Sequence, residues 1–422
     1  MSVEVINFGC RLNIAEGEAI RLAADNQDDL IVINSCAVTA EATRQARQAV
    51  RRATKRRPGA RIVVTGCAAE TDPAMFAGLA EVVGNRVKHL SSSFPRRRES
   101  ISQSGGSEEG MSRIPAFAGM TEEKKPAISG ADHARAFIEV QNGCDHRCTF
   151  CIIPYGRGES RSIPAGLVID AVKQAVDCGQ QEVILTGVDL TSYGPDLPGS
   201  PTLGMLVERI LTHVPALKRL RLSSMDSVEI DDRLFDLIIG EARIMPHVHL
   251  SLQSGDDMIL KRMKRRHSRA QAVELVERLK AKRPSLTIGA DIIAGFPTED
   301  EAMFANSLAL LDDCDIVMGH IFPYSPRTGT PAAQMPQLDR STIKARAETL
   351  RTRASERKAA WLHSMIGSTQ RALIELDRQS GHADNFANVR LETALPASNM
   401  RGTMIDVRII TSDGHTLTGI PA

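Results

Sequence analysis

The chain has 422 residues, a length typical of about three domains, and 42% of them are hydrophobic, which is enough for sizeable cores. Its 52 Lys and Arg balance 51 Asp and Glu, so an RNA surface would have to be local. No apolar run approaches the roughly 18 residues of a membrane span, and the N-terminus lacks a signal-peptide pattern. We therefore expect a cytoplasmic protein with no membrane partner, whose eight cysteines are metal ligands or reactive thiols rather than disulfides.

The first 90 residues repeat one pattern three times: an apolar strand, a cysteine and a helix. Strands that alternate with helices predict a parallel sheet, so we expect an α/β domain over residues 1–90. The predicted strands are 3–8, 30–34 and 61–65, and the predicted helices are 14–24, 39–57 and 73–79.

Residues 91–129 break this pattern, because they are rich in Ser, Gly, Pro and clustered charge. Such a composition predicts a disordered linker or insertion, and surface loops tolerate added length at little cost. An RNA-binding arm is the alternative interpretation of its arginines.

From residue 130 to about 340 a longer alternation of strands and helices follows. Six such units predict a partial (β/α)6 barrel with its site at the carboxyl ends of the strands. A connecting helix at 341–363 then leads to a predicted small β-barrel over 364–422. The predicted barrel strands are 137–141, 182–186, 219–223, 247–252, 286–292 and 315–321, with helices that include 165–177, 270–282 and 299–311, and the last four strands are 370–376, 387–391, 404–410 and 416–419.

Three cysteines, Cys144, Cys148 and Cys151, follow the first predicted barrel strand in the segment GCDHRCTFC. Three thiolates on one loop can hold a [4Fe–4S] cluster and leave one iron open, because full ligation needs four. An open iron can chelate a small molecule through an amine and a carboxylate. A zinc site with a fourth ligand such as His146 is the alternative. The segment closely resembles the cluster loop of the radical S-adenosylmethionine (SAM) superfamily, which favours the cluster.

This resemblance covers residues 134–331 and implies a set of SAM contacts. Phe150 matches the aromatic residue beside the SAM adenine, and Gly187 and Asp189 end the second strand, where the amino group is held. The sequence departs there from the common Gly-Gly-Glu form. For each polar residue a turn or cap remains the alternative. The positions that correspond to contacts with the SAM carboxylate and ribose are Ser251, Gln253, Ser254 and Gly295.

A second constellation consists of Cys10, Cys36 and Cys67, each of which follows the end of a predicted parallel strand. Ligands in open α/β sheets bind outside these carboxyl ends, so three thiols far apart in sequence should meet there. A buried structural cysteine is the usual alternative, and it is our interpretation of Cys178 and Cys314. Because the repetition is threefold, we predict a second [4Fe–4S] cluster with an open iron at the first set.

Two three-cysteine sites in this order, followed by a small β-barrel, resemble the methylthiotransferase family along nearly the whole chain except the insertion. The motifs GCRLN, INSCAVTAEA, VTGCAAE, GVDLTSYG and FPYSPRTGTPAA are most similar to the branch that acts on N6-threonylcarbamoyladenosine in tRNA. The C-terminal GHADNFANVRL resembles the TRAM substrate-binding barrel of the family. The resemblance implies two [4Fe–4S] clusters, SAM, the tRNA anticodon stem-loop and an electron donor such as flavodoxin or ferredoxin.

The same resemblance implies a division of labour between the two cysteine sets. At Cys144, Cys148 and Cys151, SAM would be split to methionine and a 5′-deoxyadenosyl radical, which takes hydrogen from carbon 2 of the adenine. At Cys10, Cys36 and Cys67, sulfur would be held for insertion. The protein's contribution is to position these cofactors and to exclude competing reactants.

Two basic runs are candidates for RNA contact, although a merely solvated helix face explains each as well. From Leu362 on the chain has five Arg, no Lys and six Asp or Glu, fewer positive charges than an RNA-binding barrel is expected to have. That count keeps open the methylthiolation of a ribosomal-protein aspartate, besides isopentenyladenosine in tRNA. A non-enzymatic iron–sulfur electron carrier with an RNA-binding barrel is a further alternative. The two runs are Arg44, Arg47, Arg51, Arg52, Lys55, Arg56 and Arg57, and Lys261, Arg262, Lys264, Arg265 and Arg266.

Overall fold

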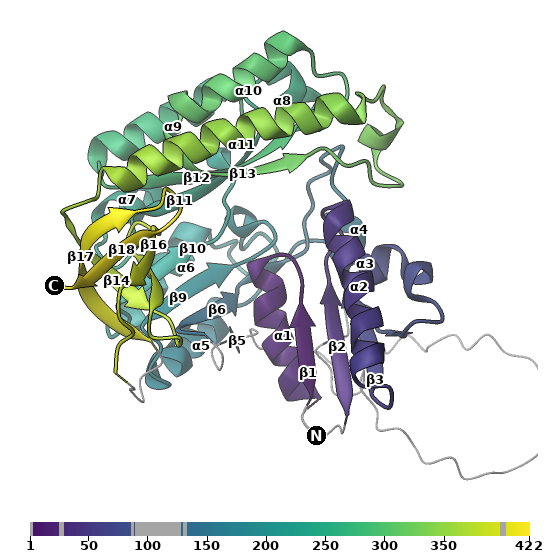
Figure 1. Ribbon diagram of the computed structural model, residues 1–422, viewed down its shortest axis with the longest axis horizontal. Helices are drawn as coiled ribbons and strands as arrows, with labels where there is room; N and C mark the ends of the chain where they lie inside the picture. The colour runs from purple at the N-terminus through teal and green to yellow at the C-terminus, as the bar shows by residue number, and fades with distance from the viewer. Residues whose placement is uncertain (1–2, 25–28, 86–87, 89–127, 130–132, 397–401) are drawn as a thin grey trace, which may run out of the picture.

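The computed structural model of the protein describes residues 3–24, 29–85, 88, 128–129, 133–396 and 402–422. Three parts follow one another along the chain: an N-terminal parallel sheet, a large barrel of strands and helices, and a small C-terminal β-barrel (Figure 1). This arrangement confirms the predicted α/β fold class. The insertion predicted at residues 91–129 lies outside the described residues, except for the short strand β5 (Ile128–Ser129).

The N-terminal part is a parallel sheet in the order β1-β2-β3-β4. The strand LIVINS is buried along its whole length, as expected for an inner parallel strand covered on both faces. The helix predicted at 73–79 is wrong, because Pro73 has no amide to continue a helix and opens only a short 3-10 turn. The elements are β1 (Glu4–Asn7), α1 (Arg11–Ala23), β2 (Leu30–Ser35), α2 (Ala40–Arg56), β3 (Arg61–Gly66), α3 (Cys67–Thr71), η1 (Pro73–Phe76) and β4 (Glu81–Val82).

Six parallel strands in chain order form the predicted partial barrel. Hydrogen bonding is continuous from β6 to β10 and from β11 to β13, and isolated bridges such as Met225–Leu250 link the two groups. β5 adds to β6 in the antiparallel sense. The strands are β6 (Arg135–Glu139), β9 (Glu182–Thr186), β10 (Arg219–Leu222), β11 (His247–Gln253), β12 (Thr287–Ala294) and β13 (Ile316–Pro323), with the small pair β7 (Gln141–Asn142) and β8 (Arg161–Ser162) beside them.

Helices cover the outside of these strands, and α11 runs along β12 and β13 (Figure 1). One apolar core extends from Ala136 through the covering helices to Ala354. The helices and 3-10 turns are α4 (Ile153–Arg157), α5 (Ala165–Asp177), η3 (Leu190–Ser192), α6 (Leu203–His213), η4 (Ser227–Glu229), α7 (Asp232–Gly240), α8 (Asp257–Met263), α9 (Arg269–Lys282), α10 (Glu301–Asp313), η5 (Pro331–Gln334) and α11 (Arg340–His363).

The C-terminal strands close into a barrel in the order β14-β15-β16-β18-β17, with an apolar core of their own. The second of them was not predicted, because its sequence SGHA has no run of apolar or β-branched residues. The turn after it docks on the large barrel, where Arg221 donates hydrogen bonds to the carbonyls of Ala383 and Asp384 at 2.8 and 2.9 Å. The strands are β14 (Thr369–Ile374), β15 (Ser380–Ala383), β16 (Asn388–Leu391), β17 (Thr403–Ser412) and β18 (Leu417–Pro421).

None of the described helices is both long enough and apolar enough to cross a membrane.

Candidate functional site

The loop that carries Cys144, Cys148 and Cys151 leaves the carboxyl end of the first barrel strand, as predicted. Gly143 begins it with φ of +78°, and a Cβ there would lie 1.9 Å from the carbonyl oxygen of Glu159, so only glycine fits. The loop then closes on itself, because the amide of Cys151 donates to the carbonyl of Cys148 at 3.1 Å. The sequence thus places three thiols on one tightly held turn.

Asp189, at the end of the second barrel strand, reaches the first of these thiols. Its Oδ2 accepts a hydrogen bond from the Cys144 thiol at 3.5 Å and lies 2.8 Å from the Nε2 of His146. Gln141 sets its backbone, since Oε1 accepts from the amides of Val188 and Asp189 at 3.0 and 2.9 Å. Cys144, His146 and Asp189 offer three ligand atoms within 4.8 Å of one another, so the zinc alternative has a geometry of its own.

Burial shapes the ionisation of the loop thiols. It raises the pKa of Cys151 to about 12, and it raises the pKa of Cys144 further, with Asp189 acting in the same direction. Such thiols are protonated at neutral pH until a metal displaces the proton. Arg265 lies beside them, since its Nη1 donates to the Cys148 thiol at 3.8 Å and its charge opposes the rise at Cys151.

Phe150 packs in the apolar cluster beside the loop, with its ring 6.4 Å from that of Phe296 in an edge-on contact. Gly187 packs against Gln141, and a Cβ on it would lie 3.0 Å from Oε1 of that glutamine. Gly295 has φ of +72° and lies against Ile343 of α11. All three positions line the carboxyl ends of the barrel strands, and their roles toward SAM remain predictions.

The three residues predicted to contact SAM at the end of the fourth strand have different surroundings. The carbonyl of Ser251 accepts from Arg265 at 2.8 Å. Gln253 has φ of +67° at a bulge, an unusual conformation for a residue other than glycine that often marks a functional site. Ser254 is buried and its hydroxyl lies 3.2 Å from that of Ser307, an arrangement that fits the structural alternative.

The second constellation also converges. Cys36 and Cys67 follow β2 and β3 directly, Cys10 precedes α1, and the thiols of Cys10 and Cys67 both raise the pKa of Cys36, which burial brings to about 11. Gly9, with φ of +91°, brings the chain so close that a Cβ on it would lie 2.7 Å from the Cys36 sulfur. Cys10 is exposed, whereas the other two are buried, so the set opens on one side.

The two thiol sets lie next to each other. α4, which follows Cys151, packs on α3, and a Cβ on Gly156 would lie 3.2 Å from the Cβ of Cys67. Asn85 joins the two segments, because its Nδ2 donates to the carbonyl of Gly156 at 2.7 Å and points at the Cys67 sulfur at 3.9 Å. The N-terminal thiol set therefore lies against the segment that follows the barrel thiol set.

Arg157 is the buried link between these parts, and sequence reasoning had assigned it no role. Its Nη1 donates to Glu16 of α1 and to the side-chain oxygen of Asn142, both at 2.9 Å, and its Nη2 also contacts Asn13. Lys88 adds a second ion pair to Glu16 at 2.6 Å. Burial lowers the pKa of Arg157, but Glu16 and the thiols of Cys67 and Cys10 outweigh it, so the guanidinium stays charged beside the N-terminal set.

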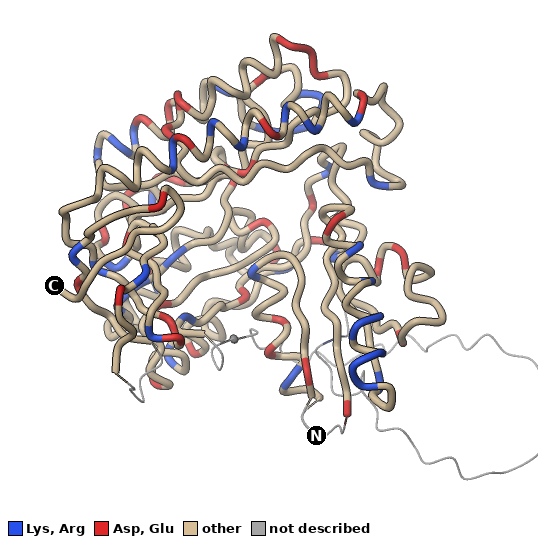
Figure 2. Tube along the Cα trace, in the orientation of Figure 1, with Lys and Arg blue, Asp and Glu red and all other residues tan. Residues whose placement is uncertain are grey.

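In the second predicted basic run, three arginines have protein partners, whereas Lys261 and Lys264 are exposed. Arg262 donates to the carbonyl of Thr298, Arg265 pairs with Asp226 at 2.9 Å, and Arg266 pairs with Glu229 at 2.5 Å. The run ends α8 beside the cysteine loop, so these side chains turn to protein partners. The first run differs, because α2 presents exposed basic residues along one side (Figure 2).

The two remaining cysteines behave differently from each other. Cys314 is buried in the barrel core, as predicted. Cys178 is exposed, so its interpretation as a buried residue is wrong. It ends α5 immediately before Gly179, where a helix terminus faces solvent.

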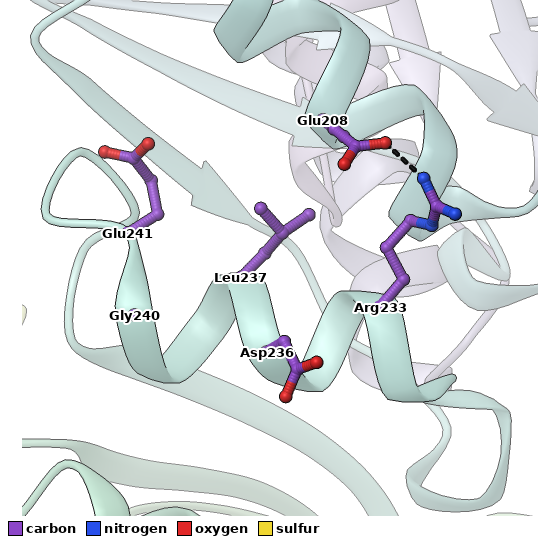
Figure 3. Close-up of a pocket in the computed structure, with 6 residues that line it drawn as sticks. All are labelled: Glu208, Arg233, Asp236, Leu237, Gly240 and Glu241. Carbon is purple, nitrogen blue, oxygen red and sulfur yellow. Dashed lines mark hydrogen bonds and ion pairs between the residues drawn. The ribbon is translucent and has the colours of Figure 1, made fainter.

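Figure 3 shows a groove on the outer helices α6 and α7, where Arg233 pairs with Glu208. Its lining contains Asp236 and Glu241 but no cysteine and no residue of the strand ends. It is therefore separate from the candidate site.

Comparisons with known proteins agree with this geometry. The model of the radical SAM superfamily matches residues 138–311, and that of the uncharacterised protein family UPF0004 matches residues 2–84. The chain is 48% identical over 398 residues to the threonylcarbamoyladenosine tRNA methylthiotransferase MtaB of Rickettsia prowazekii (93% of this chain, 92% of the relative). It is 33% identical over 410 residues to MtaB of Aquifex aeolicus (93% and 97%). It is 32% identical over 392 residues to the tRNA-2-methylthio-N(6)-dimethylallyladenosine synthase of Erythrobacter litoralis (88% and 86%).

A cysteine loop at the head of a partial barrel and the family match over that barrel define a radical SAM enzyme. The relatives narrow this class, because they match along almost the whole chain, including the N-terminal part. The chain belongs to the tRNA methylthiotransferase family. The predicted resemblance is thereby confirmed.

Proposed function

We propose that this enzyme adds a methylthio group to carbon 2 of N6-threonylcarbamoyladenosine in the anticodon stem-loop of tRNA. The observation that carries the proposal is the meeting of two three-cysteine sets, one on the barrel loop and one on the N-terminal sheet. A reaction that needs both a radical and a sulfur atom at one carbon requires two such centres side by side. The names of the relatives from Rickettsia prowazekii and Aquifex aeolicus supply the nucleoside.

Both sets fit [4Fe–4S] clusters. Each offers three thiols, the ligand type that iron–sulfur clusters require, and three thiols leave one iron without a protein ligand. Arg157 and Arg265 lie beside the thiols and would offset the negative charge of thiolate ligation. When bound, SAM and these clusters would supply the radical chemistry at the C2–H bond and the sulfur that replaces the hydrogen.

The chain's own residues would position these groups. Asp189, held through Gln141 and paired with His146, presents a carboxylate where the SAM amino group is expected. Phe150 presents an aromatic ring beside the loop. Arg157 would help to fix the N-terminal part against the barrel loop, because its buried guanidinium binds both Glu16 of α1 and Asn142.

Partners follow from the same proposal. α2 begins shortly after Cys36, and its exposed basic side, which extends from there toward the opposite edge of the sheet, supports contact with RNA phosphates. SAM cleavage consumes one electron, so a small electron carrier such as flavodoxin or ferredoxin would dock near the barrel loop. We place the reaction in the cytoplasm, where its tRNA substrate is found.

Mass spectrometry of tRNA nucleosides tests the proposal. A deletion strain should accumulate N6-threonylcarbamoyladenosine without its 2-methylthio group, and the gene in trans should restore the modification. Restoration of the methylthio group on an isopentenyladenosine instead would favour the activity named for the Erythrobacter litoralis relative. Unchanged tRNA, with loss of methylthiolation on a ribosomal-protein aspartate, would assign the enzyme to a protein substrate.

A further inference from the structure

The interior of the large barrel holds a polar cluster below the cysteine loop. His249 of β11, Asp291 of β12 and His320 of β13 come from neighbouring strands and meet at one carboxylate oxygen. Asp291 Oδ1 lies 3.0 Å from Nε2 of His249 and 3.3 Å from Nδ1 of His320. His249 is buried, whereas the side chain of His320 is 59% exposed, so the far side of its ring faces open space.

Arg11 faces the same cluster from the N-terminal part. It directly follows Cys10, and its guanidinium carbon lies 5.1 Å from the centre of the Phe386 ring. Within the described part of the chain, this guanidinium makes no hydrogen bond and no ion pair. Phe386 in turn stacks on His247, whose ring centre lies 6.3 Å from that of His249, so a series of ring contacts connects Arg11 to the cluster.

The other guanidiniums nearby already have anionic partners. Arg219 and Arg221 pair with Glu182 at 2.9 and 3.0 Å, and Arg135 pairs with Glu375. Asp291 is engaged by two imidazoles. Among the described residues of this interior, the half-buried guanidinium of Arg11 thus lacks an anionic partner, and a partly desolvated cation is stabilised when a ligand supplies the counter-charge.

The surroundings of a neighbouring histidine are also rich in positive charge. His247 is buried and stacks on Phe386 with ring centres 4.8 Å apart. Burial lowers its pKa, and Arg221, Arg11 and two neighbouring histidines lower it further. These neighbouring positive charges favour an anionic ligand beside His247.

We propose that Arg11, together with His320, binds the carboxylate on the N6 side chain of the substrate adenosine. This inference rests on the proposed function and names the residues that select the substrate. The N6-threonylcarbamoyl group carries a carboxylate, whereas a dimethylallyl group is uncharged. Because Arg11 follows a thiol of the N-terminal set, a carboxylate held there would keep the adenine between the two thiol sets. Asp291 orients the ring of His320 toward it.

Two synthetic stem-loop RNAs test the assignment. One carries N6-threonylcarbamoyladenosine, and the other carries the same group with its carboxylate converted to the neutral carboxamide. With the full, anaerobically reconstituted chain, we expect kcat/KM and affinity by fluorescence anisotropy to favour the carboxylate by about ten- to hundredfold. Arg11→Gln should remove most of this preference, Arg11→Lys should retain part of it, and His320→Ala should reduce it less. Arg209→Gln, on the exposed side of α6, is the matched control and should keep the full preference.

The outcomes separate the two proposals. A wild-type protein with no preference, or an Arg11→Gln variant that weakens both RNAs equally, would overturn the carboxylate site. Tight zinc binding that His320→Ala abolishes would also overturn it, in favour of a metal site. If neither RNA is methylthiolated yet the anisotropy preference and its loss in Arg11→Gln persist, the carboxylate site stands and the proposed reaction fails.

Discussion

The two cysteine sets each bring three thiols together, but they do so by different structural means. Cys144, Cys148 and Cys151 lie on a single loop, so local backbone geometry brings them together. Cys10, Cys36 and Cys67 come from the ends of three strands and meet only when the parallel sheet has formed. The barrel set therefore depends on the geometry of one turn, whereas the N-terminal set depends on tertiary structure. Single substitutions can disturb the turn or the tertiary contacts separately.

The largest effect is expected at the joint between the sets. Arg157→Met would leave Glu16 buried with only Lys88 and the Asn142 amide as donors, and would remove the donor to the side-chain oxygens of Asn13 and Asn142. Removing one member of a buried ion pair costs about 3 to 5 kcal/mol of unfolding free energy. Urea denaturation measures it, with the exposed Arg52→Met on α2 as the control, for which a change below about 0.5 kcal/mol is expected. Equal losses in both variants would mean that the buried network contributes nothing.

A substitution at Gly143 should affect the barrel thiol set and leave the N-terminal set intact. Gly143→Ala places a methyl group on the Glu159 carbonyl and forces an alanine into positive φ, at a combined cost of about 2 to 5 kcal/mol. Gly199 has the same φ of +78° but no atom within 4 Å of a Cβ, so Gly199→Ala isolates the backbone strain. Iron analysis should show that Gly143→Ala loses the barrel iron and keeps the N-terminal iron, while Gly199→Ala keeps both. Loss of iron from both sites in Gly143→Ala would refute the independence of the two sets.

The barrel should also respond to acid through Glu182. Burial alone raises the pKa of this carboxyl, but Arg221, Arg219 and Arg135 outweigh it and hold the pKa at about 2. Because the folded pKa lies below the unfolded value of about 4.3, the stabilisation is complete above that value and is lost as the pH falls toward 2. The contribution is on the order of 3 kcal/mol. Urea unfolding measures this. Between pH 7 and pH 3 the free energy of unfolding should fall more steeply for wild type than for Glu182→Gln. If it falls equally in both proteins, Glu182 does not contribute to the acid sensitivity.

The smallest effect is expected at the two cysteines outside the sets. Reconstituted protein should hold about eight irons and eight sulfides, the content of two cubanes. Cys178→Ser, at an exposed helix end, and Cys314→Ser, in the barrel core, should leave this content unchanged. About four irons in folded wild-type protein, or tightly bound zinc, would contradict two clusters.

The convergence of the cysteines was largely predictable from the sequence, because each set lies at the ends of predicted strands. The position of a cysteine after an apolar strand is visible in the sequence, and parallel strands bring such positions to one edge. Arg157 follows the cysteine loop closely in the sequence, but its partners Glu16 and Asn13 lie in another domain, and no local pattern pairs residues so far apart. For the same reason, composition could not show that Arg265 and Arg266 of the second basic run have acidic partners on another segment.

The interior cluster was missed for a different reason. Asp291 and His320 each interrupt an apolar strand, whereas His249 alternates with other polar residues in β11, and only the register of three neighbouring strands brings them together. Arg11 was passed over within GCRLN because the cysteine beside it carried the evident chemistry. A single polar residue in a strand that is otherwise buried was the available signal.

The division of labour between the two sets is tested most directly by two triple variants. In Cys144→Ala, Cys148→Ala, Cys151→Ala, formation of 5′-deoxyadenosine from SAM should be abolished. In Cys10→Ala, Cys36→Ala, Cys67→Ala, some 5′-deoxyadenosine should still form while no methylthiolated nucleoside appears, because sulfur has no site. Chromatography with mass spectrometry measures both products in one reaction. Methylthiolated nucleoside from the folded N-terminal variant that retains one cluster would contradict the assignment of Cys10, Cys36 and Cys67 to sulfur delivery.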